Sequence, residues 1–132
     1  MISLIHSNPL LVFTSLCFLC PSILSFLKAH YIHSILCFHS SIISTLYWCN
    51  THNKHMLLYD QYAATIASVY WLSYTFLKPH KYKSYIVLFY TISAISYYTS
   101  LTISDISSYW VLFHFVFHMS TITGSTVYFL SI

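Results

Sequence analysis

The sequence predicts an all-α integral membrane protein, a single domain over residues 1–132 built as a compact bundle of about five transmembrane helices. Of its 132 residues, 58% are hydrophobic and only 5% are charged, and the mean hydropathy is +0.69. Soluble domains carry about 25% charged residues, so this composition is typical of a chain surrounded by lipid. Arginine is absent, and the five lysines are scattered between apolar runs. Nucleic-acid binding, which needs a basic face, is therefore excluded.

Five apolar stretches come close to the length of about 20 residues that an α-helix needs to cross a bilayer. They are separated by short polar breaks: Lys28, the run NTHNKH, the run KPHKYK and the neighbourhood of Asp105. The first stretch could also be a signal peptide, but it has no basic n-region and its apolar run is longer than usual. We therefore expect retained helices over residues 10–27, 30–49, 56–77, 82–103 and 107–131.

The lysines predict how this bundle is oriented in the membrane. Cytoplasmic loops carry an excess of lysine and arginine. One side of the predicted bundle has the C-terminus and four lysines, Lys28, Lys78, Lys81 and Lys83. The other side has the N-terminus, Lys54 and Asp105. We therefore expect a cytosolic C-terminus and an N-terminus outside.

Ionisable side chains inside a spanning helix are costly and often functional. His114 and His118 are four residues apart, which places both imidazoles on one helix face, about 6 Å apart. This spacing suits two zinc ligands. With a rise of about 1.5 Å per residue, Ser44, Asp60 and His39 share the outer half of the bundle with this pair. Two interpretations are open: a metal site, or interhelical hydrogen bonds that satisfy buried polar groups.

Three segments together resemble the CREST superfamily, which contains alkaline ceramidases, adiponectin/progestin-type receptors and haemolysin III-type proteins. The segments are SIISTLYW, LLYDQYAATIASVYW and HFVFHMSTITG. The resemblance implies that His114 and His118 bind zinc and that Ser44 and Asp60 support a metal-bound water. It also implies hydrolysis of a lipid amide.

The chain departs from the family pattern at two points. Trp48 stands where the family has its first zinc histidine, and an indole N–H is a donor only, so it cannot ligate zinc. The family core has seven helices, whereas this chain has room for five. His39 is one replacement for the third ligand, and His52 or His55 could fold back from a loop instead. Without a replacement, the two imidazoles and Asp60 could form a weaker three-ligand site, because carboxylates are common ligands of catalytic zinc.

Three functions follow as hypotheses. The first is a reduced zinc-dependent hydrolase, in which zinc lowers the pKa of its bound water to about 7. The second is a relative that kept the fold and lost the chemistry, for which Trp48 is the direct argument. The third is a non-enzymatic membrane subunit or scaffold whose polar residues face partner helices, either of another membrane protein or of a second copy. Membrane lipids are the expected partners in all three.

Overall fold

The computed structural model describes residues 8–103 and 106–132, and every regular element in these two ranges is an α-helix. The prediction of an all-α chain is therefore confirmed. In chain order the elements are α1 (Pro9–Leu16), α2 (Leu19–Leu27), α3 (Tyr31–Cys49), α4 (Lys54–Leu77), α5 (Lys83–Ile103) and α6 (Trp110–Leu130). The last four differ from the predicted ranges by at most three residues at either end.

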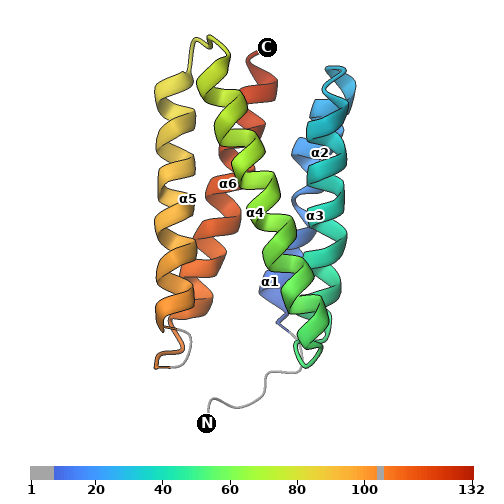
Figure 1. Ribbon diagram of the computed structural model, residues 1–132, viewed down its shortest axis with the longest axis vertical. Helices are drawn as coiled ribbons and strands as arrows, with labels where there is room; N and C mark the ends of the chain where they lie inside the picture. The colour runs from blue at the N-terminus through green and yellow to red at the C-terminus, as the bar shows by residue number, and fades with distance from the viewer. Residues whose placement is uncertain (1–7, 104–105) are drawn as a thin grey trace.

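The first predicted helix, 10–27, is in fact two helices that form one rod, α1–α2, with a break at Cys17 and Phe18 (Figure 1). Pro21 causes the break, because proline has no N–H to give to the carbonyl four residues earlier. The carbonyl of Cys17 instead accepts a hydrogen bond of 3.1 Å from the N–H of Cys20. The expectation of one uninterrupted helix is corrected on this point, while the count of five rods holds.

Side-chain caps explain where two of the helices begin. The side-chain oxygen of Asn8 accepts a hydrogen bond from the N–H of Leu11, and the N–H of Asn8 donates to the carbonyl of Trp48. This second bond ties the start of α1 to the end of α3. The side-chain oxygen of Asn53 accepts from the N–H groups of His55 and Met56, which starts α4 two residues before the predicted boundary. Both residues satisfy backbone donors that a helix start leaves unpaired.

The rods are arranged so that α6 packs on α5 and on the α1–α2 rod, while α3 packs on that rod and on α4 (Figure 1). The approach of α5 and α6 is close at Gly124, where an added Cβ would lie 3.2 Å from Cβ of Phe89. By contrast, α4 and α5 contact each other only sparsely. The bundle is therefore least tightly closed between α4 and α5.

One end of the bundle carries the α2–α3 connection, the α4–α5 connection and the C-terminus (Figure 1). Hydrogen bonds hold this end together: the Tyr74 hydroxyl lies 3.3 Å from Nδ1 of His30, and the Ser131 hydroxyl 2.9 Å from Nε2 of His80. The four lysines predicted to share a side lie at this end: Lys28 follows α2, Lys78 and Lys81 follow α4, and Lys83 begins α5. Lys54 begins α4 at the other end, and Asp105 lies outside the described residues.

The surface of the bundle is apolar and much of its interior is polar. Large hydrophobic side chains are exposed along α1 to α5, among them Phe13, Phe26, Ile35, Val69 and Tyr98, whereas α6 exposes them only near its ends. Buried positions include many Ser, Thr, His and Asp side chains. Among the described residues, two helical stretches, Pro9–Leu27 and Lys83–Ile103, are long and apolar enough to cross a membrane by length and composition.

Candidate functional site

Ser44 and Asp60 form the first half of a polar site inside the bundle. Ser44 lies on the buried face of α3 and is 6% exposed, and Asp60 lies one turn and a half into α4 and is 7% exposed. The Ser44 hydroxyl donates a hydrogen bond to Oδ1 of Asp60. The two residues that the sequence predicted to act together are therefore brought into direct contact.

His118 forms the second half, from α6. It is 1% exposed, and its Nδ1 atom lies 2.8 Å from the hydroxyl of Thr14 on α1. The Phe18 ring meets the imidazole edge-on, with 5.4 Å between the ring centroids. Nε2 is therefore the ring nitrogen that the Thr14 contact leaves for other partners.

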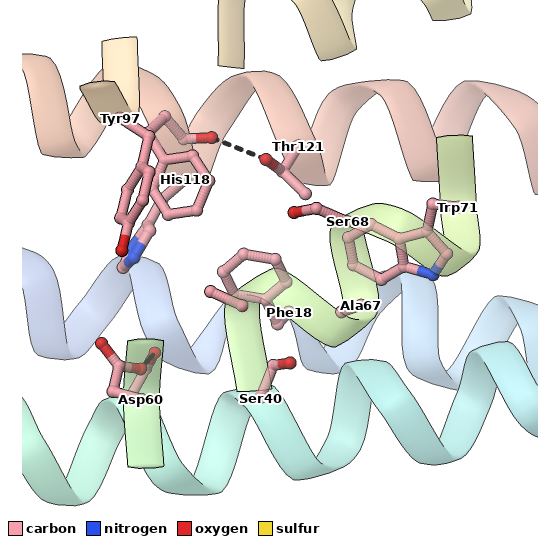
Figure 2. A pocket seen from close by; sticks show the side chains of 12 residues that line it. Phe18, Ser40, Asp60, Ala67, Ser68, Trp71, Tyr97, His118 and Thr121 are labelled. Atoms are coloured by element: carbon pink, nitrogen blue, oxygen red, sulfur yellow. Dashed lines mark hydrogen bonds between the residues drawn. The ribbon is translucent and has the colours of Figure 1, made fainter. Parts of the chain in front are cut away.

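A small cavity lies between these two halves (Figure 2). Its volume, measured as the space open to the centre of a water molecule, is about 20 Å³. A buried water needs roughly 10–15 Å³ by this measure, so the cavity has room for about one. Asp60 lies on one side, and the His118 ring and the Tyr97 hydroxyl lie on the other. Its lining comes from α2, α3, α4, α5 and α6 or their caps: Phe18, Ser40, Ser44, Asp60, Ala64, Ala67, Ser68, Trp71, Tyr97, Phe117, His118 and Thr121.

A larger cavity of about 210 Å³ by the same measure adjoins the small one between α4, α5 and α6. Half of the side chains that line it also line the small cavity: Ala64, Ser68, Trp71, Tyr97, Phe117 and Thr121. Its remaining lining, Thr65, Val69, Leu72, Tyr90, Ser93 and Ala94, comes from α4 and α5, where these helices contact each other sparsely. The larger cavity therefore lies beside the polar site, at the place where α4 and α5 contact each other sparsely.

His114 has different surroundings from His118, although its ring centroid lies only 4.8 Å away. The ring is 7% exposed and meets Trp48 edge-on, with 5.0 Å between the ring centroids. Its Nδ1 atom is 3.4 Å from the Ser100 hydroxyl, which donates a shorter bond of 2.7 Å to the carbonyl of Tyr97. Its Nε2 atom and Nε1 of Trp48 are buried, and neither has a hydrogen-bond partner in the described part of the chain. His114 is not among the side chains that line the small cavity.

The three histidines considered as a third zinc ligand do not lie beside this pair. His39 is on the exposed face of α3, whereas its neighbour Ser40 is buried, and His52 and His55 are exposed near the α3–α4 connection. Within residues 8–103 and 106–132, no group of three or more His, Cys, Asp or Glu side chains is placed to hold a metal ion.

The zinc centre implied by the resemblance can be tested against these donors. Trp48, four residues after Ser44, does lie against His114, which is where a third imidazole would be needed. It contributes only an N–H donor, which repels rather than ligates a cation. Catalytic zinc sites use three protein ligands, and within the described residues Asp60 does not join the two histidines as the third. The residues present therefore do not fit this metal.

Sequence reasoning missed Thr14, which lies against His118, and Tyr97, which lines both cavities. Thr14 belongs to the first predicted helix and Tyr97 to the fourth, and neither has a spacing that separates it from the many other hydroxyl-bearing residues. No protein-family model matches the chain, and no match was found among curated proteins or among solved structures. The resemblance to the CREST superfamily therefore stays a prediction.

Proposed function

We propose that this chain is a multi-pass membrane protein that binds an N-acyl lipid, with the amide group of the lipid between Asp60 and His118. One observation carries the proposal. A carboxyl group and an imidazole face each other across a small cavity, inside a bundle whose outer surface is apolar (Figure 2).

The membrane part of the proposal is supported by the distribution of polarity. In water, exposing so many large hydrophobic side chains while burying Ser, Thr, His and Asp would be unfavourable. In a bilayer the same arrangement is favourable, because lipid covers the apolar exterior and the polar groups bond between helices. We propose that all five rods cross the membrane, with the lysine-rich end in the cytosol and the N-terminus outside.

The lipid class is supported by the chemistry of the cavity. A secondary amide offers one N–H donor and one carbonyl acceptor, which point in opposite directions because the amide is trans. An amide group is larger than the single water for which the small cavity has room, so binding would widen the cavity between α4 and α6. A carboxyl oxygen of Asp60 would then accept from the N–H, and a ring N–H of His118 would donate to the carbonyl. The adjoining 210 Å³ cavity would take the first part of the acyl chain, which then leaves between α4 and α5.

Binding without turnover is the form of this function that the donor set supports. The resemblance implies hydrolysis by zinc-bound water, but Trp48 stands at the place of the third ligand. We therefore propose a relative of hydrolytic proteins that has kept the lipid site and lost the metal chemistry.

One observation favours metal-free hydrolysis as a second candidate. The small cavity has room for about one water beside Asp60, whose carboxyl group is held by Ser44. A positioned carboxylate can act as a general base on such a water. Release of free fatty acid by purified protein, lost in an Asp60→Ala variant, would establish this candidate.

The experiment for the main proposal is photolabelling in lipid nanodiscs, with an N-acyl sphingoid base that carries a diazirine in its acyl chain. We expect labels on α4, α5 and α6. An unlabelled N-acyl lipid should compete at least about tenfold better than an ester lipid of equal chain length, because a hydrogen bond to a charged group contributes about 1.5–3 kcal/mol.

Two matched pairs of variants sharpen this experiment. Asp60→Ala should abolish the preference for the amide lipid, whereas His39→Ala, on the exposed face of α3, should keep it. Ala94→Phe fills the mouth of the larger cavity and should reduce labelling, whereas Ile95→Phe points away and should not. Equal competition by amide and ester lipids in the unmodified protein would overturn the proposal.

A further inference from the structure

We infer that Thr14 is a positioning residue for His118: its hydroxyl donates a hydrogen bond to Nδ1, so that the imidazole carries its proton on Nε2. The contact joins two residues that are 104 positions apart in the chain, and Oγ1 lies 2.8 Å from Nδ1. Thr14 is 0% exposed, so water does not compete for this bond.

The surroundings of Thr14 decide which partner donates. A threonine hydroxyl has one proton, and a second acceptor is in reach, the carbonyl of Leu11 at 3.2 Å. That carbonyl already accepts a hydrogen bond of 2.7 Å from the Ser15 hydroxyl, in addition to its place in the helical ladder. Thr14 therefore donates its proton to Nδ1 rather than to the Leu11 carbonyl, because Nδ1 is nearer and has one lone pair that can accept it.

The hydrogen bond at Nδ1 also decides whether Nε2, on the other side of the ring, carries a proton. A neutral imidazole carries one proton, so an Nδ1 atom that accepts requires an N–H at Nε2. This N–H belongs to the side of the cavity that faces Asp60, whose carboxyl group is an acceptor (Figure 2). Thr14 thus gives the cavity an N–H donor on one side, from His118, opposite the carboxyl acceptor of Asp60 on the other.

The α1–α2 rod also fixes the plane of the ring. Thr14 comes from the last turn of α1, and Phe18 follows at the break between α1 and α2. The first bonds to the His118 ring and the second meets it edge-on. The inference concerns the protein without any ligand and does not rest on the proposed lipid.

The test is ¹⁵N NMR of the protein with labelled histidine, at alkaline pH, in detergent micelles or bilayers. Protonated and unprotonated ring nitrogens have widely separated ¹⁵N shifts, and a His118→Gln spectrum identifies the signals of His118 by their loss. We expect Nδ1 of His118 in the unprotonated region, shifted by its accepted hydrogen bond, and Nε2 in the protonated region.

Three variants separate positioning from mere packing. Thr14→Ser keeps a hydroxyl and should keep the Nδ1 signal in place. Thr14→Val keeps the shape, and its Nδ1 signal should move to the position of an unprotonated nitrogen without a hydrogen bond. Ser25→Ala, which removes a buried hydroxyl on α2 that donates to the carbonyls of Pro21 and Ser22, should leave the signal unchanged. A protonated Nδ1 in the unmodified protein would overturn the inference. So would an Nδ1 signal that is the same in the serine and valine variants. If the valine variant does not fold, the serine variant still tests the inference.

Discussion

His114 and His118 lie on the same face of α6, four residues apart and both buried, yet the structure gives them different surroundings. His118 has a short hydrogen bond to Thr14 on one side and a polar cavity with Asp60 on the other. His114 is enclosed by aromatic rings, with a long contact to Ser100 and an unpaired Nε2 atom. Helical spacing therefore establishes that two side chains share a face, but the neighbouring helices decide what each of them does.

Trp48 is the neighbour that gives the two histidines their different surroundings. Its indole contacts both Trp110 and His114, which also meet each other edge-on, and the two indoles are stacked at 5.7 Å between ring centroids. With a histidine there, the two imidazoles of α6 would have a third ligand beside them. With tryptophan, one imidazole becomes part of an aromatic cluster and the other keeps a polar role.

The largest effect is expected from removing the indole. Trp48→Ala should lower the free energy of unfolding by about 3–5 kcal/mol, the usual cost of truncating a buried aromatic side chain. Unfolding followed by circular dichroism against increasing SDS would measure it. Tyr98→Ala, an exposed aromatic on α5, is the control and should change stability by no more than about 0.5 kcal/mol. Equal stability of the two variants would show that Trp48 does not hold the cluster together.

A second prediction separates the two histidines by ligand binding. His118→Ala should weaken competition by the N-acyl lipid about tenfold, since one hydrogen bond is lost. His114→Phe should change it less than about twofold, because His114 does not line the cavity. Photolabelling in nanodiscs gives both numbers, and a larger loss in the His114 variant would reverse the assignment of roles.

The smallest effect concerns stability at His114. Replacing this imidazole by phenylalanine removes a buried acceptor without a partner, which offsets the small loss of the Ser100 contact. The free energy of unfolding should stay within about 1 kcal/mol of the unmodified value. A His118→Phe variant takes away the short bond of the Thr14 hydroxyl, leaves it only the longer bond to the Leu11 carbonyl and fills the cavity, so it should be clearly less stable in the same SDS titration. If both replacements lower the free energy of unfolding by the same amount, the two imidazoles contribute equally to stability, which would contradict this prediction.

Much of the fold followed from the sequence, because each rod is an apolar stretch with a polar break at its end. The α1–α2 break was missed, because hydrophobicity is continuous through Cys17 and Phe18 although Pro21 interrupts the hydrogen bonds. In the site, the bond between Ser44 and Asp60 joins two residues that the sequence had grouped. The different surroundings of His114 and His118 were not predictable, because they depend on which side chains of α1 and α3, Thr14 and Trp48, reach the two rings.

The most direct test is the zinc content per chain of the purified protein, by mass spectrometry after expression with added zinc, beside a Trp48→His variant. Our account holds that Trp48 keeps the two imidazoles of α6 from forming a metal site. It predicts no stoichiometric zinc in the unmodified protein and about one zinc per chain in the variant, since a third imidazole completes a three-ligand site. About one zinc per chain in the unmodified protein, lost on His114→Ala, would contradict it and make both histidines metal ligands.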